Sequence, residues 1–379
     1  MRRALGLAFE GRVFRDHFLI TDIRMAADFP PERWFWFDPP FHPGQSALLH
    51  RQPDQVWRID LQLGRDADPQ VEVRPDRVIP RLKAMLGAER RFEIEWTSIY
   101  TFQCRRLGKF RHGRVIFLGD AAHQVSPFGA RGFNSGIQDA DNLAWKLAYV
   151  LAGRAPETLL DSYDEERLVA ADENIRHSTR STEFITPRDP ASRALRDAVL
   201  ALAEHYAFAR RMINSGRLST PTDLCFSSLI TPDRDAFAAG LTPGSPCQDA
   251  PLLHAGKPCW LLPQLAPGAT LLLFLDDPDA LGARTAAALR SLAGERVPIE
   301  TRLILRREGG APATIQGLWA LSDVEGLAAR RYGARSGSAC LVRPDQHLTA
   351  RWRRFEPDTV RQAAQRMLKD LVPSAVAGG

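Results

Sequence analysis

The sequence predicts a chain of several globular domains of the α/β and α+β classes, and three observations predict it. Strand-like alternation runs from Phe9 to Phe102, a continuous apolar run at 115–118 leads through a glycine-rich loop into a helix, and strands alternate with helices after residue 268. A length of 379 residues allows two or three domains, and 44% apolar residues are ordinary for packed cores.

Composition excludes several classes of function. No apolar run approaches the roughly 18 residues of a membrane span, and the apolar stretch in "MRRALGLAFEG" is too short for a secretory signal, so we expect a cytoplasmic protein with no membrane partner. The net charge is +5, but the arginines are scattered and form no basic block, so we expect no nucleic acid partner. The five cysteines form no CxxC pair and show no zinc spacing, so we expect reduced thiols and no metal.

The first hundred residues predict an antiparallel or mixed sheet with one buried face. Apolar and polar residues alternate in "VWRIDLQL" (56–63) and "EIEWTSIYTF" (93–102). The apolar positions are Trp57, Ile59, Leu61 and Leu63, then Ile94, Trp96, Tyr100 and Phe102. The aromatic, proline-rich "RWFWFDPPFHPG" (33–44) predicts a strand that runs into a turn or a pocket wall, with core packing as the alternative for each aromatic.

The next segment, "GRVIFLGD", predicts a parallel strand at 114–119. Its apolar run does not alternate, which is typical of a strand buried on both faces, and Asp120 then lies at the carboxyl end of that strand. A helix is predicted from about 134 to 151, with Ser135 and Gln138 as a capping box and Gly153 as its stop.

This junction has the chemistry of a nucleotide site. A helix N-terminus presents unpaired N–H groups and partial positive charge. A carboxylate at a strand end, such as Asp120, can accept hydrogen bonds from sugar or ribityl hydroxyls. Gly129, Gly132 and Gly136 let the backbone approach a flat ring.

Beyond the junction the sequence predicts helices and then a separate α/β region. Helical stretches are predicted at 156–180, broken by "ITPRDP", and at 191–214, followed by a linker at 216–250. Further on, the sequence predicts strands at 269–275 and 297–305, helices at 279–293 and 323–332, a hairpin about Asp345–Gln346 and a final helix at 357–371. This βαβαββα order resembles a thioredoxin fold. "DDPDALG" (276–282) stands where a thioredoxin carries CxxC, so we expect no disulfide exchange.

One run of motifs resembles a known family. "GDAAH" (119–123), Pro127, Gly-x-x-Gly-x-Asn (129–134), Asp139 and "NLAWKLA" are similar to the second flavin motif of the aromatic-ring hydroxylases. These are single-component FAD monooxygenases (class A flavoproteins) of the para-hydroxybenzoate hydroxylase fold.

The resemblance extends over nearly the whole chain and implies a domain layout. Residues 1–105 correspond to the substrate-domain sheet, with a remnant of the FAD domain at 1–8. Residues 106–190 correspond to the C-terminal half of a Rossmann-like FAD-binding domain, and 191–242 to a helical segment and linker. Residues 243–379 correspond to the thioredoxin-like domain, here without CxxC, of the phenol hydroxylase and 3-(3-hydroxyphenyl)propionate hydroxylase branch.

The resemblance also implies site residues, although it identifies no catalytic residue. Asp120 would bind the ribityl–ribose region of FAD, while Pro127 and Phe128 would form the lip between flavin and substrate. The implied cofactor-binding positions are Gly119, Asp120, Pro127, Gly129, Ala130, Arg131, Gly132, Phe133 and Asn134. Many family members have Gly-Gly-Gln-Gly at 129–132, so the role of Arg131, solvated or not, stays open. His123 is implied to order the loop rather than to act as a base, and Tyr163 and Arg167 of "LDSYDEER" to be structural.

Two family motifs are absent from this sequence. Members begin with GxGxxG and carry a later DGxxSxxR, and neither occurs in residues 1–379. The layout therefore implies an N-terminally truncated chain that starts roughly 150 residues late and is inactive alone.

The family's reaction gives the expected function. NADH or NADPH reduces FAD, O₂ adds to give a flavin hydroperoxide, and a small phenolic or aromatic substrate is hydroxylated. A homodimer is compatible with this layout. Two alternatives stay open: a non-catalytic fragment that acts as a binding or assembly module, and a flavoprotein of the same fold that catalyses another oxidation, such as epoxidation or a halogenase-like reaction.

Overall fold

The computed structural model describes residues 1–27, 29–213, 215–217, 220–306 and 311–370. The chain forms two compact units and enters each of them more than once. The first unit contains Met1–Gly108, Phe117–Gly136 and Ala171–Thr220, and the second contains Lys109–Ile116, Ile137–Ala170 and Pro221–Gly379.

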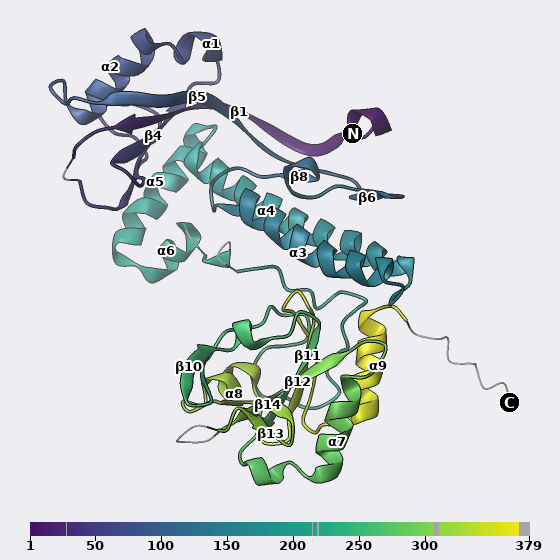
Figure 1. Ribbon diagram of the computed structural model, residues 1–379. Coiled ribbons are helices and arrows are strands. Elements are labelled where there is room, and N and C mark those ends of the chain that lie inside the picture. The colour runs from purple at the N-terminus through teal and green to yellow at the C-terminus, as the bar shows by residue number, and fades with distance from the viewer. Residues whose placement is uncertain (28, 214, 218–219, 307–310, 371–379) are drawn as a thin grey trace. The chain divides into compact units, whose positions relative to one another are not determined.

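A sheet with the strand order β2-β3-β4-β1-β5-β8 dominates the first unit, and every strand pair in it is antiparallel. Its longest strands, β1 and β5, run side by side (Figure 1). The strands are β1 (Phe9–Arg24), β2 (Arg33–Trp36), β3 (Ala47–Arg51), β4 (Val56–Leu63), β5 (Glu93–Leu107) and β8 (His123–Gln124).

One face of this sheet, the covered face, packs against α2 (Pro75–Leu86), which follows the short α1 (Pro69–Glu72). Leu82 of α2 lies in one apolar cluster with Leu19 and Ile23 of β1. The predicted burial of the apolar positions at 56–63 is confirmed, since each of them is at most 3% exposed. Sequence analysis did not predict the two helices, each of which begins with a proline at its first position.

The opposite face of the sheet, the open face, carries the even-numbered residues of β1 and β4. Directly opposite residues of antiparallel strands project to the same side, and Asp22 lies opposite both Arg58 and Trp96. Trp96 is 45% exposed and Tyr100 is 54% exposed. The predicted buried row in β5 is therefore wrong except at Phe102: Trp96 and Tyr100 lie on the face that α2 does not cover, and Ile94 is 37% exposed.

The long helices of the chain are α3 (Arg131–Leu151) and α4 (Asp161–Ile185), the latter preceded by η3 (Glu157–Leu160). The predicted helix at 134–151 is confirmed but begins earlier, so Ser135 lies inside it and is no cap. Its hydroxyl instead accepts a 2.8 Å hydrogen bond from Asn174. The predicted helix at 191–214 is two helices, α5 (Pro190–His205) and α6 (Ala207–Ile213), separated at the extended residue Tyr206. Positions 214 and 218–219 lie outside the described residues.

The second unit has a sheet with the strand order β10-β9-β14-β12-β11-β15-β16, and β13 pairs with β14. Strands β11, β12 and β14 are mutually parallel, while β15 is antiparallel to β11 and β16 is antiparallel to β15. The strands are β9 (Pro251–His254), β10 (Lys257–Trp260), β11 (Ala269–Leu275), β12 (Ile299–Leu305), β13 (Thr314–Ile315), β14 (Leu318–Ser322), β15 (Ala339–Val342) and β16 (Leu348–Trp352).

Helices cover both faces of this second sheet. α7 (Ala283–Leu292) and α9 (Pro357–Met367) share one apolar cluster with β11, and α8 (Leu327–Tyr332) lies in the cluster on the other face (Figure 1). All seven residues of β11 are buried, as expected of a strand between two layers. The predicted strand at 269–275 and the hairpin at Asp345–Gln346 are confirmed. The predicted last helix ends at Met367, and position 371 lies outside the described residues.

The predicted parallel strand at 114–119 is wrong. Within this segment only Val115–Ile116 (β7) forms a strand, and it pairs antiparallel with Arg111–His112 (β6) in a hairpin. Both residues of β7 are half-buried. A parallel strand needs a neighbour supplied by a crossover connection, and the described residues place none beside β7, so the segment pairs locally.

Candidate functional site

The junction at residues 119–134 is a compact loop that leads into α3. Gly119 has φ +56° and opens a single turn, η2 (Gly119–Ala121), in which the Ala122 N–H donates to the Gly119 carbonyl at 2.8 Å. A Cβ on Gly136 would lie 3.4 Å from Cα of Gly119. Glycine at these two positions thus lets the loop and the helix approach each other.

The residues predicted to cradle a cofactor form a second turn at the start of α3. Gly129 has φ +100° and Ala130 has φ +53°, and the Ala130 N–H donates to the Pro127 carbonyl at 3.0 Å. The Asn134 amide donates to the Ala130 carbonyl at 2.7 Å. The turn brings the backbone to the helix N-terminus, where the first N–H groups have no partner within the helix.

Polar and apolar groups are exposed together at this junction. The carboxylate of Asp120 belongs to an exposed residue, as do Pro127 and Gly129. Phe133 in the first turn of α3 is 80% exposed, and Leu118 just before Gly119 is 38% exposed. An exposed acceptor beside uncovered apolar side chains suits a ligand that has both a flat apolar ring and hydroxyl groups.

The loop is fastened to its surroundings within the first unit. The Ser126 hydroxyl donates to the Ser178 carbonyl at 3.2 Å and accepts from the Thr182 hydroxyl at 2.8 Å. The ring of Phe128 meets Phe102 edge-on, with centroids 5.2 Å apart, and Phe18 in the same way at 5.9 Å. Phe128, the predicted lip residue, therefore joins the loop to the open face of the sheet.

Two neighbouring side chains are buried. Arg131 is 5% exposed and its guanidinium donates to the Thr220 carbonyl, so the solvated alternative is wrong. His123 is 2% exposed and lies in β8, opposite Arg106 of β5. This position fits the predicted ordering role of His123, which stays a prediction.

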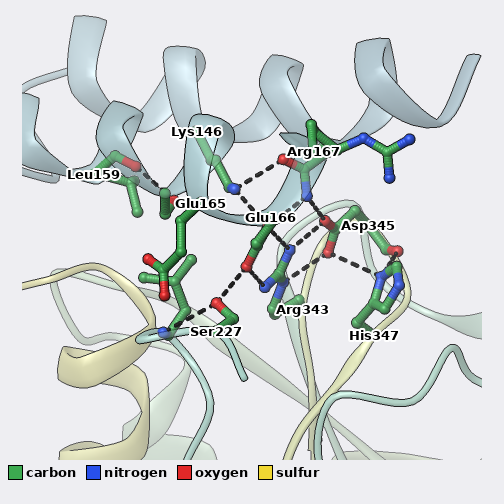
Figure 2. Close-up of polar contacts among 12 residues, drawn as sticks. Lys146, Leu159, Glu165, Glu166, Arg167, Ser227, Arg343, Asp345 and His347 are labelled. Atoms are coloured by element: carbon green, nitrogen blue, oxygen red, sulfur yellow. Dashed lines mark hydrogen bonds and ion pairs between the residues drawn. The ribbon is translucent and has the colours of Figure 1, made fainter. Parts of the chain in front are cut away.

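Sequence analysis missed a buried ion network in the second unit, which Figure 2 shows. Glu166 of α4 is fully buried and accepts hydrogen bonds from Lys146 of α3 at 2.7 Å and from Arg343 at 2.6 and 3.0 Å. The Asn142 amide donates to the same carboxylate at 2.7 Å. Every charge in this cluster has a partner of the opposite sign.

The network continues into the turn between β15 and β16. Arg343 donates to Asp345 at 2.8 and 2.5 Å, and the Ser227 hydroxyl donates to Glu166 (Figure 2). Burial alone raises the pKa of Glu166, but the charges of Arg343 and Lys146 outweigh it and hold that pKa well below its ordinary value. Polar residues at four-residue spacing on an otherwise apolar helix face, Asn142 and Lys146, were the signal in the sequence. Their arrangement indicates a structural role.

The other residues predicted to be structural are also buried. Tyr163 is fully buried, and the Arg167 guanidinium donates to the Asp139 carboxylate at 2.6 Å.

All five cysteines are free thiols. None of the helices in the described residues combines the length with the apolar composition that crossing a membrane requires.

Comparisons with known proteins agree with the motifs. Residues 1–178 match the family described as FAD binding domain. A 3-(3-hydroxy-phenyl)propionate/3-hydroxycinnamic acid hydroxylase of Mycolicibacterium gilvum is 33% identical over 212 residues, covering 56% of this chain and 37% of that protein. A probable NADH-specific resorcinol 4-hydroxylase of Rhodococcus jostii is 29% identical over 357 residues, covering 92% of this chain and 60% of that protein.

The fold also matches a solved structure. The flavin-dependent monooxygenase PieE, in complex with FAD and substrate, superposes with a TM-score of 0.73 at 20% identity, covering 97% of this chain and 67% of that one. The predicted resemblance to FAD-dependent aromatic hydroxylases is thus confirmed. The chain spans between 37% and 60% of the length of the two curated relatives.

Proposed function

We propose that this chain carries the substrate sheet and the second half of the FAD site of a monooxygenase that uses NADH or NADPH and O₂ to hydroxylate a small phenolic or aromatic compound. One observation carries the proposal. An exposed carboxylate, Asp120, lies in a glycine turn next to the N-terminus of α3, inside the segment that matches the FAD binding domain.

The residues at the junction fit FAD. Asp120 would accept hydrogen bonds from ribityl or ribose hydroxyls, and the N–H groups at the start of α3 would face the electron-rich edge of the ring. Leu118 and Phe133, both exposed, would pack against its apolar parts. When bound, the flavin supplies the redox and oxygen chemistry, and this chain's residues supply binding, orientation and exclusion of water.

The lip residues link the two parts of the site. Phe128 packs on Phe18 and Phe102 of the open face, so the loop that would hold the flavin also fixes one edge of the substrate surface. Pro127, exposed beside it, would lie against the ring. This arrangement supports a substrate bound between the open face and the cofactor.

The C-terminal region fits a thioredoxin-like domain that packs rather than exchanges disulfides. The strand order β12-β11-β15-β16, with its parallel and antiparallel pairs, supports that fold, and the segment 276–282 carries no cysteine. Burial raises the pKa of Cys247 to about 12, which keeps that thiol inert. We expect no turnover in an insulin-reduction assay. The predicted domain boundaries, the cytoplasmic location and a homodimer belong to the same proposal.

Titration of FAD into the purified chain, followed by flavin fluorescence, tests the proposal. Because the sequence contains no GxGxxG, we expect weak binding and no phenol-stimulated oxidation of NADH or NADPH by residues 1–379 alone. Asp120→Ala should weaken FAD binding by about 10- to 150-fold, since it removes charge-assisted hydrogen bonds worth roughly 1.5–3 kcal/mol.

The matched control is Asp76→Ala, which removes an exposed carboxylate from α2 and should leave FAD binding unchanged. Equal FAD affinity in the wild-type chain and the Asp120 variant would contradict the site. Tight, stoichiometric quenching by the wild-type chain would contradict the expected weakness of this half-site.

A further inference from the structure

One carboxylate on the open face, that of Asp60, has an oxygen to which no described residue donates a hydrogen bond. Asp60 lies in β4 and is half-buried, and its Oδ1 is shielded from solvent without a partner in the described part of the chain. The residues directly opposite it, Ile20 on β1 and Leu48 on β3, are apolar and offer no donor. A shielded acceptor without a donor costs free energy, so its presence calls for an explanation.

The nearest arginine on the same strand is already engaged. Arg58 donates from Nε and from a terminal nitrogen to the two oxygens of Asp22, both at 2.8 Å. Its charge and that of Arg33 favour the ionised form of Asp60, but burial outweighs them and raises the pKa of Asp60 to about 6. Asp60 is therefore mostly ionised at neutral pH and still lacks a donor.

The position of Asp60 connects it to the flavin loop. Phe18, against which Phe128 packs, lies directly opposite Gln62. Asp60 is two residues from Gln62, a distance of about 7 Å along the strand. The neighbouring rows of the same face carry Tyr100 and Trp96, both exposed. The carboxylate thus lies on the same face as these aromatic side chains, separated from their strand by β1, and two residues along β4 from the row that holds Phe18.

We propose that Asp60 binds the hydroxyl group of a phenolic substrate on the open face. The inference rests on the proposed function for the presence of a flavin and for the aromatic substrate, and it adds the residue that recognises the hydroxyl group of that substrate. A phenol provides a hydrogen-bond donor for this carboxylate, which is only partly buried, together with an apolar ring.

Charge selects a neutral phenol over an aromatic acid. The Asp60 carboxylate disfavours an aromatic acid whose carboxylate points at it. A charge-assisted hydrogen bond to Asp60 would also draw the phenolic proton away from its oxygen, which raises electron density at the ortho and para ring carbons.

The test measures binding of phenol and of anisole, which has no O–H group, to the full chain by saturation-transfer NMR. Phenol should bind about fivefold more tightly at pH 7.5 than at pH 5, because the ionised carboxylate is the better acceptor. Anisole should show no such preference. Asp60→Asn should abolish the pH dependence and weaken phenol binding about fivefold at pH 7.5.

Other groups near Asp60 carry charge, so variants are needed to assign the pH effect. Arg58, Arg33 and Asp22 face it, and His50, opposite Arg58, has its pKa lowered by burial and by Arg33 and Arg58. Asp76→Asn on α2 removes the same charge away from the open face and should behave like the wild-type chain.

Two results would overturn the inference: no saturable phenol binding to the wild-type chain, or equal phenol binding and pH dependence in Asp60→Asn. The experiment contains no flavin. Its failure would remove the role of Asp60 and leave the FAD titration, which tests the proposed function, unaffected.

Discussion

Two carboxylates in this molecule, Glu166 and Asp60, are both removed from water to some extent, but they differ in the hydrogen-bond donors around them. Glu166 is fully buried and receives hydrogen bonds from a lysine, an arginine, an amide and a hydroxyl. Asp60 is half-buried, lies between apolar residues of the two adjacent strands, and has an oxygen without a donor among the described residues. The pKa of Glu166 is lowered and that of Asp60 is raised. The satisfied charge stabilises the fold, whereas the unsatisfied one is available to a ligand.

The largest predicted change in the free energy of unfolding comes from a substitution in the buried ion network around Glu166. Glu166→Ala leaves Lys146 and Arg343 buried without that carboxylate and should lower the free energy of unfolding by about 3–5 kcal/mol. Urea denaturation followed by circular dichroism measures it. A loss below about 1 kcal/mol would mean that the network is not structural.

Replacing Asp60 is expected to change the free energy of unfolding by a smaller amount, and to raise it where the Glu166 substitution lowers it. Because its folded pKa is raised, the folded chain binds more protons than the unfolded chain between about pH 4 and 6, so the stability that Asp60 contributes falls as pH rises through that window. Asp60→Asn should therefore raise the free energy of unfolding at pH 7.5 by about 1–3 kcal/mol and have little effect at pH 4. Thermal melts at the two pH values test this, and destabilisation at pH 7.5 would contradict it.

The smallest change in the free energy of unfolding is expected at an exposed ion pair, which serves as the reference for the Glu166 and Asp60 substitutions. Arg74 and Asp76 form a solvent-exposed ion pair at the start of α2, with N–O 3.0 Å. Arg74→Ala should change the free energy of unfolding by less than about 1 kcal/mol at any pH, because water and salt screen the pair. A larger cost in the same urea experiment would show that exposed charges matter here as much as buried ones, which would remove the contrast.

Local sequence patterns predicted those helices and strands that can be recognised without knowing which other segment they pair with. Alternation at 56–63 gave the covered face, and the apolar run at 269–275 gave the buried strand β11. The same kind of run at 115–118 failed, because a parallel strand depends on neighbours that local sequence does not show. Ser135 failed as a cap because α3 begins four residues earlier, at Arg131.

The site was predictable only where a motif marks it. The glycine turns and Asp120 follow from the motif, and the structure places Gly119 close to Gly136 of α3. The pairing of Glu166 with Arg343 joins residues 177 positions apart, and no local pattern reports it. Asp60 occupies an ordinary polar position in an alternating strand, and only the register of β1, β3 and β4 shows that its neighbours are apolar.

The central claim, that Asp60 is an unpaired carboxylate held for a phenol, is tested most directly by carboxyl-carbon NMR titration of Asp60 with and without phenol. We predict a pKa near 6 in the chain alone and a lower pKa with phenol bound, because a hydrogen-bond donor stabilises the ionised form. A pKa near the ordinary value of about 4 that phenol does not change would contradict the claim.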